Sequence, residues 1–421
     1  MLFNLEVLSN EKKRIIRFDN VTNIFSDPET GENLLAASRM QDYLRLTDIY
    51  DFDRSDLGVL YINLGLNCNF KCKYCHQNKF RTTTDVVPCT PELALELIEI
   101  LKKADIHPAG VSFWGGEPLV FWKSIKVLVP ALREMYPEAT INFPTNGALL
   151  TEEIVDFLKK YNAGFYISYD GKATNRDCSI FDDSDIREFF QRTQVPLDIM
   201  PTQNRASIPI QAIRDELHGM GLKLRSISAY SIARCNPYNR EQAEEIRIPQ
   251  DRIDSYSAFI YRVLRDEEKH GKLFKGVKNR FAFVVSLFYR GLGVDSADVR
   301  YCGNMVGRDI CIDCTGTMFN CMNIPLFKMG NILDFKPFDA SKIYHSHLKK
   351  QACMSCPFVS VCRGGCPLIH DDSSLEFEVN CNNIKGLAVP FFRMTVEVLL
   401  GVYLKRIVRV DPDKPLPLQE P

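Results

Sequence analysis

The sequence lacks the segments that direct a chain into or across a membrane. Its start, Met1–Glu6, runs into the charged stretch Glu11–Arg14 without an apolar core, so no secretory signal is predicted. No run reaches the ~18 apolar residues that a membrane helix needs. The best candidate, Met394–Leu404, is short and contains Glu397. We therefore expect a soluble, cytoplasmic protein with no membrane partner.

The chain also lacks a net charge of either sign. Its formal charge is -1, which excludes a general basic affinity for nucleic acid. With 45% hydrophobic residues, it has the composition of a folded protein and not of a long disordered chain. A length of 421 residues allows two to three domains of ordinary size.

Cysteine is the residue type that is present in excess, with 15 in the chain. Structural disulfides are not expected in a reducing compartment, so metal or cluster ligation is the leading explanation. Three cysteines lie within residues 68–75 and nine follow residue 300. The remaining three, Cys89, Cys178 and Cys235, are scattered and are interpreted as small hydrophobic residues.

From residue 58 the sequence alternates between strand, loop and helix patterns. The predicted strands cover residues 59–64, 110–114, 140–143, 164–168, 197–200 and 226–230. Helices are expected between these strands, and Thr90 and Thr151 are expected to cap two of them. Repeated strand–helix units favour a parallel sheet, whose carboxyl-end loops build the site. About six units are too few for a closed barrel of eight, so we predict an α/β fold with a partial, open barrel.

The remaining segments complete the predicted domain organisation. Residues 1–57 are expected to form an irregular, partly β leader without a winged-helix pattern, and residues 241–300 a helical linker. Residues 301–385 are poor in predicted helix and rich in cysteine. A small domain of this kind needs bound metal to stabilise its fold. Residues 389–409 are predicted as an amphipathic helix, and the 386–421 segment ends in a disordered tail.

Three cysteines, Cys68, Cys72 and Cys75, follow the first strand of the predicted barrel in one short loop. A [4Fe-4S] cluster normally takes four cysteines, so three would leave one iron open. The alternative is a zinc site with His76 as a further ligand.

This Cys-x3-Cys-x2-Cys spacing, with Tyr74 before the last cysteine, resembles the radical S-adenosylmethionine (SAM) superfamily. The resemblance covers residues 58–240 and implies a partial (β/α)6 barrel. It implies that SAM chelates the open iron. An electron from a donor such as flavodoxin or ferredoxin then cleaves SAM to a 5'-deoxyadenosyl radical, which abstracts hydrogen from the substrate.

The loops after the later strands support the resemblance. The sequence Gly115-Gly116-Glu117-Pro118 resembles the family loop that contacts the amino group of SAM. The resemblance assigns further cofactor contacts to Tyr74, Asn146, Ser168 and Asp170. Arg176-Asp177 stands in reversed order relative to the family pattern, so no contact with the SAM carboxylate is assigned to it.

A second set of cysteines resembles the SPASM extension of radical enzymes that modify peptides. Gly316 fits a β-hairpin turn that delivers Cys321. The resemblance implies two auxiliary [4Fe-4S] clusters, three clusters in all. The nearer one would be held by Cys302, Cys321 and Cys366, and the farther one by Cys353, Cys356, Cys362 and Cys381.

The fourth ligand of the nearer cluster stays open, because Cys311 and Cys314 are the only local thiols. Cys311 is the preferred candidate, and an iron without a protein ligand is the other. Zinc-ribbon sites are the alternative for the whole set, since Cys-x2-Cys pairs also bind zinc.

The resemblance leaves two substrate classes. Sulfatase maturases commonly carry an Asp base after the hairpin cysteine, where this chain has Met322. We therefore expect a maturase that cross-links a ribosomally made peptide, with the auxiliary clusters accepting an electron. Sulfatase maturation is the alternative, and a non-catalytic iron–sulfur or zinc-binding protein is the alternative of another class. Spacing singles out no acid or base among His76, Tyr230, Arg234, Asp295 and Asp298.

Overall fold

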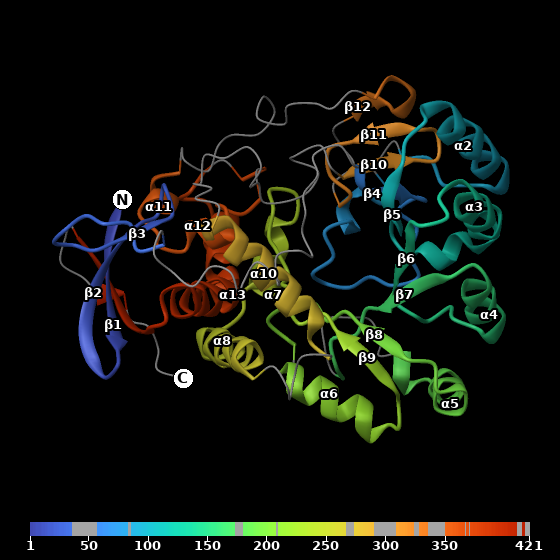
Figure 1. Ribbon diagram of the computed structural model, residues 1–421. Helices are drawn as coiled ribbons and strands as arrows, with labels where there is room; N and C mark the ends of the chain where they lie inside the picture. Colours follow the sequence, from blue (N-terminus) through green and yellow to red (C-terminus); the bar gives the residue numbers. More distant parts are fainter. Residues whose placement is uncertain are drawn as a thin grey trace. The chain divides into compact units, whose positions relative to one another are not determined.

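The computed structural model describes two compact units, drawn together in Figure 1. The terminal unit comprises residues 1–52, 247–301 and 343–421, and the sheet unit comprises residues 53–246 and 302–342. The structure describes residues 1–35, 57–82, 86–172, 180–207, 209–266, 273–289, 309–323, 328–335, 350–366, 368–369, 371–410 and 415–416.

The sheet unit contains a nine-stranded sheet in the order β12-β11-β10-β4-β5-β6-β7-β8-β9. Neighbouring strands from β4 to β9 are all parallel. The bounds are β4 Leu57–Asn63, β5 Pro108–Trp114, β6 Thr140–Thr145, β7 Ala163–Ile167, β8 Leu197–Ile199 and β9 Leu224–Ile227. All six strands predicted from the sequence are present, and the α/β class with a largely parallel sheet is confirmed.

Helices follow the strands and cover the outer face of this sheet (Figure 1). The α-helices are α2 Pro91–Ala104, α3 Trp122–Met135, α4 Glu152–Lys160, α5 Ser184–Thr193, α6 Ile210–Gly219 and α7 Ala243–Ile246. The short 3-10 helices are η2 Asn78–Phe80, η3 Pro118–Phe121, η4 Ile180–Asp182, η5 Arg240–Gln242 and η7 Ile332–Asp334. The predicted caps are confirmed: Thr90 Oγ1 accepts the Leu93 N–H, and Thr151 Oγ1 accepts the Ile154 N–H, both at 3.3 Å.

The predicted hairpin at Gly316 is present, and it extends the parallel sheet. Its strands are β10 Ile310–Asp313 and β11 Thr317–Phe319, followed by β12 Lys328–Asn331. Gly316 has φ +77°, the left-handed conformation that glycine adopts at no steric cost. Strand β10 pairs in parallel with β4, with Ile310 opposite Leu60.

A buried disulfide joins this hairpin to the loop before α2. It links Cys89 with Cys314, whose Cα atoms are 5.7 Å apart. The prediction that disulfides are absent, and that Cys89 is a simple hydrophobic residue, is therefore wrong at this pair. The bond also leaves Cys311 as the one free thiol of the two candidates for a fourth cluster ligand.

The terminal unit contains a five-stranded sheet in the order β14-β13-β1-β2-β3. Its elements are β1 Leu2–Ser9, β2 Lys12–Asp19, β3 Ile24–Ser26, α8 Gln250–Arg265, α10 Lys275–Tyr289, α11 Gln351–Met354, α12 Val359–Cys362, α13 Leu375–Leu400, β13 Tyr403–Arg409 and β14 Pro415–Leu416. The predicted leader is thus a regular antiparallel sheet, in which β1 pairs with β13 from the other end of the chain.

The predicted helix over residues 389–409 is corrected. The helix begins at Leu375 and ends at Leu400, because Gly401 adopts φ +66° and terminates it. Residues Tyr403–Arg409 form a strand instead. In the predicted disordered end, the described residues Pro415 and Leu416 pair with β13.

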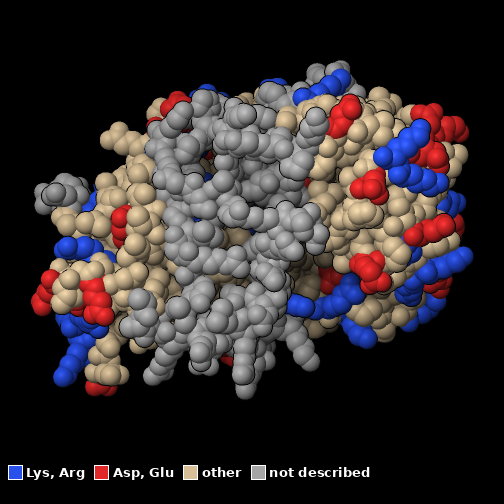
Figure 2. All heavy atoms as spheres, turned by 45° about the horizontal axis from the view of Figure 1, so that its top comes forward, with Lys and Arg blue, Asp and Glu red and all other residues tan. Residues whose placement is uncertain are grey.

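In the part of the chain that the structure describes, no helix is long and apolar enough to cross a membrane. Figure 2 shows basic and acidic side chains mixed over the helices of the sheet unit. This mixture agrees with the near-zero formal charge of the sequence.

Candidate functional site

Cys68, Cys72 and Cys75 lie in the loop directly after β4, at the carboxyl edge of the parallel strands. None of the three forms a disulfide with a described cysteine, and all three are partly exposed. The Phe70 N–H donates to Cys68 Sγ at 3.3 Å, and the Cys75 N–H donates to the Cys72 carbonyl at 3.1 Å. Burial raises the pKa of Cys68, while the bond from Phe70 lowers it. Backbone N–H bonds to sulfur are among the interactions that tune iron–sulfur ligands.

The Gly115-Gly116-Glu117-Pro118 loop after β5 packs directly on the start of this cysteine loop. The Gly116 N–H donates to the Gly65 carbonyl at 3.0 Å, and the Glu117 N–H donates to the Asn67 carbonyl at 2.9 Å. A Cβ on Gly116 would lie 2.6 Å from the carbonyl carbon of Asn67. Glycine is required here because one backbone touches the other.

The Glu117 carboxylate ties three segments together. Its Oε1 accepts the Leu119 N–H at 3.0 Å and the Thr145 hydroxyl at 2.7 Å, and its Oε2 accepts the Asn146 N–H at 2.7 Å. The residue is 1% exposed. The predicted SAM contact of Glu117 stays a prediction, and the structure adds a second role, which is to fix the end of β6 against the loop after β5.

We expect Glu117→Gln to lower the free energy of unfolding by about 1–3 kcal/mol, because the new amide group faces a donor inside the protein. Urea denaturation under anaerobic conditions measures this change. The exposed Glu138→Gln is the matched control and should stay within about 0.5 kcal/mol. An unchanged urea midpoint together with weaker SAM binding would assign the carboxylate to the ligand alone.

Tyr74 and Asp170, both predicted to contact the cofactor, are brought together. Both are buried, and the Tyr74 hydroxyl donates to Asp170 Oδ2. The other carboxylate oxygen of Asp170 accepts the Thr202 N–H at 2.7 Å. This chain of bonds connects the cysteine loop with the ends of β7 and β8.

Asn146 and Ser168 stand at the ends of β6 and β7. The Asn146 side-chain amide donates to Asn69 Oδ1 at 2.7 Å and lies 4.0 Å from Cys68 Sγ. The Ser168 N–H donates to the Thr145 carbonyl at 2.8 Å. Asn146 therefore contacts the cysteine loop directly, which its position in the sequence does not reveal.

His76, next to the last cysteine, is fixed by residues that sequence reasoning missed. Its Nδ1 lies 3.0 Å from the Asn236 side-chain nitrogen and 3.4 Å from that of Asn239. Burial, followed by the charge of Arg234, lowers the pKa of His76 to about 4. The ring is therefore neutral at pH 7, with Nδ1 as the acceptor, and it anchors the cysteine loop to the segment after β9.

Four cysteines of the terminal unit, the predicted ligands of the farther cluster, lie within electrostatic range of one another. The pKa of Cys353, Cys356 and Cys362 is raised to about 12, mainly by burial and in smaller part by neighbouring thiols, Cys381 among them. The Phe358 N–H hydrogen-bonds to Cys356. Binding to a metal deprotonates a thiol outright, so these raised values do not oppose ligation.

Within the described residues, no three His, Cys, Asp or Glu side chains meet closely enough to bind one metal ion. The cysteines of a [4Fe-4S] cluster bind separate irons and need not meet. The grouped thiols, with the Phe70 and Phe358 N–H groups directed at sulfur, therefore fit a cluster.

The β-sheet of the terminal unit holds the cysteine segment in place. The Asn20 side-chain amide donates to the carbonyls of Met354 and Cys356, both at 2.9 Å, and the Ser360 hydroxyl donates to the Asn20 carbonyl at 3.2 Å. Arg409 donates to the Ser355 carbonyl at 2.6 Å. Because the partners of Asn20 lie more than 330 residues away, no local sequence signal could have identified it.

The predicted ligands of the nearer cluster are described only in part. Cys302 lies outside the described residues, Cys321 belongs to the sheet unit and Cys366 to the terminal unit. Cys311 is fully buried beside Val86 and Phe319, and burial, then Cys321, raises the pKa of its thiol. The assignment of these four residues stays a prediction.

Several other residues named in the sequence analysis are assigned no role. Asp295, Asp298, Arg176 and Asp177 lie outside the described residues. Tyr230 is 39% exposed. No catalytic acid or base is assigned.

Comparisons with known proteins address the family and the fold of the chain. Residues 62–195 match the model of the Radical SAM superfamily. The resemblance predicted from the three cysteines is confirmed. The radical SAM cyclopropyl synthase TigE of Paramaledivibacter caminithermalis is 29% identical over 154 residues, 33% of this chain. The match spans only about a third of that relative, 32% of its length.

Two solved structures share the fold. Native anSMEcpe with bound AdoMet has a TM-score of 0.56 at 18% identity, covering 81% of this chain and 99% of that one. Streptococcus suis SuiB bound to S-adenosylmethionine has a TM-score of 0.50 at 16% identity, covering 77% and 76%.

Proposed function

We propose that this chain is a radical SAM enzyme that modifies a residue of a peptide or protein. The observation that carries the proposal is the position of the Cys68–Cys75 loop at the carboxyl edge of the parallel sheet. The residues just before it, Gly65 and Asn67, accept hydrogen bonds from the Gly116 and Glu117 N–H groups. In this proposal the sheet is a partial (β/α)6 barrel, and the three cysteines hold a [4Fe-4S] cluster with one iron left for SAM. When bound, cluster and cofactor supply a 5'-deoxyadenosyl radical that abstracts hydrogen.

The surrounding residues orient the cofactor and fix the loop. Gly115, Gly116 and Glu117 would hold the amino acid end of SAM. Asn146 and Ser168 at the strand ends, together with the hydrogen-bonded pair Tyr74 and Asp170, would line the nucleoside. A rigid network of this kind positions a reacting group at low entropic cost.

A peptide substrate is supported by the relatives. The anSMEcpe protein has also been solved with AdoMet and a bound peptide, and TigE is named as a cyclopropyl synthase. We propose an oxidative cross-link, a thioether or a carbon–carbon bond, in a ribosomally made peptide. Removing a second electron requires an acceptor, and we assign this role to two auxiliary clusters in a SPASM-type cysteine-rich segment.

Met322 favours cross-linking over sulfatase maturation. It occupies the position after Cys321 where the maturases carry an acidic base. Here the side chain packs on the apolar cluster of Val86, Cys311 and Phe319, while the Met322 carbonyl lies 3.4 Å from the Gln77 side-chain nitrogen. An apolar, packed thioether cannot remove a proton.

Co-expression with each short peptide encoded beside the gene, followed by mass spectrometry, tests the proposal. We expect the loss of two hydrogens from one peptide. The double variant Cys356→Ala/Cys362→Ala should retain SAM cleavage and lose this product, because the farther cluster is absent. Cys235→Ala, a buried cysteine outside both sets, should retain both activities. Unchanged product in the double variant would contradict the electron-acceptor role.

A further inference from the structure

Arg363 carries a guanidinium group that the protein buries without a hydrogen-bond partner. The residue is 3% exposed, and among the described residues none pairs with any of its three side-chain nitrogens. Its backbone has φ +57°, a conformation that is costly for a residue with a Cβ. A buried charge is strongly unfavourable unless an opposite charge compensates it. Two unfavourable features at one residue therefore point to an anion that binds beside it.

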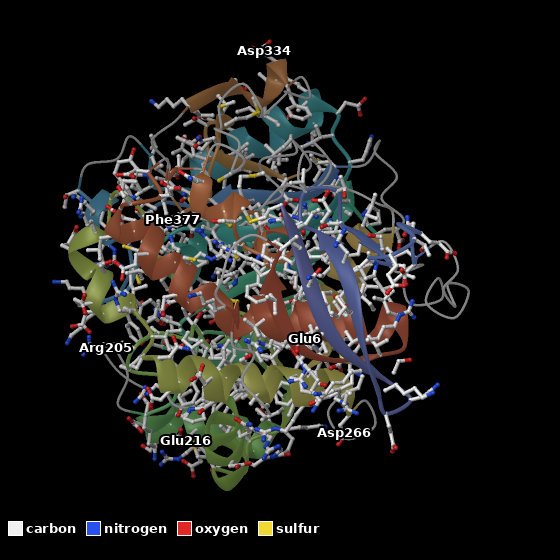
Figure 3. The ribbon with its side chains drawn as sticks, turned by 90° about the vertical axis from the view of Figure 1, so that its left-hand side faces the viewer. Glu6, Arg205, Glu216, Asp266, Asp334 and Phe377 are labelled. Carbon is white, nitrogen blue, oxygen red and sulfur yellow. A yellow bond between two sulfur atoms is a disulfide. The ribbon has the colours of Figure 1, made fainter. Side chains whose placement is uncertain are left out.

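A second cation, Lys350, is buried in the same segment. It is 5% exposed, and its Nζ donates to the Gly364 carbonyl at 3.2 Å. It also lies 5.4 Å from the ring centroid of Phe377, which Figure 3 labels. The nearby carboxylate of Asp372 accepts the Ala352 N–H at 3.0 Å, so it is shared with the backbone.

The groups that face these two cations are thiols. Cys353, Cys366 and Cys362 lie within electrostatic range of Lys350, and Cys362 directly precedes Arg363. Among the described residues, the further charged group that acts on Arg363 is another cation, Arg280, which repels it. The local charge is therefore positive until the thiols are ionised and carry a cluster.

We propose that Lys350 and Arg363 are positioning residues that act as buried counter-charges for an iron–sulfur cluster held by Cys353, Cys356, Cys362 and Cys381, and raise its reduction potential. The inference rests on the proposed function, because the cluster is part of it. Four thiolates around a [4Fe-4S]²⁺ core carry about two net negative charges, and about three after one-electron reduction. The electron removed from the substrate radical becomes the third charge, so buried cations stabilise the reduced form more than the oxidised form.

The exposed Lys385 provides a matched control. It lies near the thiols of Cys356 and Cys381 and carries the same charge, but water surrounds it. Screening by solvent reduces the influence of such a charge on a buried site. Charge removal at Lys385 and at the two buried cations therefore separates a built-in counter-charge from a general surface effect.

The test is a redox titration of the full-length reconstituted protein, followed by electron paramagnetic resonance. Cys68, Cys72 and Cys75 are replaced by alanine in all samples, so that only the auxiliary clusters give signals. We expect Arg363→Met and Lys350→Met each to lower one midpoint potential. The equilibrium constant for reduction should fall about tenfold, equal to ~59 mV for one electron. Arg363→Lys should keep most of the midpoint potential measured with Arg363 in place. Lys385→Gln should change the midpoint potential less than either Met variant.

Each outcome supports or overturns the proposal. If iron is bound and both Met variants shift no more than Lys385→Gln, the counter-charge role is wrong while the proposed function stands. If the variant without Cys68, Cys72 and Cys75 binds no iron, the counter-charge proposal fails; if the wild-type protein also binds none, the proposed function fails as well. Because Lys350 and Arg363 are tested separately, a fold defect in one variant leaves the other to decide.

Discussion

Replacing Cys68, Cys72 and Cys75 together by alanine is expected to abolish the release of 5'-deoxyadenosine from SAM. The three thiolates are the ligands that the loop after β4 supplies, and the cluster cannot be held without them. Anaerobic incubation with SAM and dithionite, followed by chromatography, measures the product. Iron content should fall from roughly twelve to roughly eight atoms per chain by cluster counting.

The control for this variant is Cys235→Ala, which removes a buried thiol outside the predicted ligand sets. It should release 5'-deoxyadenosine at the wild-type rate. If the triple variant also keeps that rate, the assignment of the cysteine loop is wrong, and so is the proposed radical chemistry.

Gly116→Ala is expected to have the second largest effect. Its new methyl group would meet the carbonyl of Asn67, and neither backbone can yield without moving the loop that carries Cys68. We expect the free energy of unfolding to fall by about 2–3 kcal/mol. A displacement of about 1 Å in the cysteine loop should reduce 5'-deoxyadenosine release by about a hundredfold. Urea denaturation and the same chromatographic assay measure these two quantities.

Gly219→Ala is the matched control, because nothing lies within 4 Å of a Cβ at this last residue of α6. It should leave release unchanged and raise stability slightly by restricting the unfolded chain. Equal behaviour of the two variants would show that the contact between Gly116 and Asn67 is not required.

Local patterns predicted the sheet unit well. Thr90 and Thr151 cap helices where the sequence placed them, since a capping bond depends on residues three positions apart. Gly316 was assigned to a hairpin turn because only its own backbone conformation matters there. The loop containing Cys68 and the loop containing Gly116 were also found, since both follow strands of strong pattern.

Contacts between distant segments could not be predicted in this way. Asn236 holds His76 and Asn20 holds the Cys356 carbonyl, yet neither asparagine differs in sequence from an ordinary turn residue. The pairing of Cys89 with Cys314 depends on how the hairpin joins the sheet. Residues Tyr403–Arg409 were given the wrong element because their strand depends on pairing with β1, which lies at the other end of the sequence.

The position of β10 has a consequence for synthesis of the chain on the ribosome. β4 precedes the cysteine loop, but its neighbour on one side is β10, with Val59 bonded to Asp309 across 250 positions. At ordinary translation speed this gap takes roughly 12 to 50 s to cross. During that time the nascent chain presents an open strand edge next to apolar residues. A lower growth temperature, or a chaperone that shields this edge, should therefore increase the yield of folded protein.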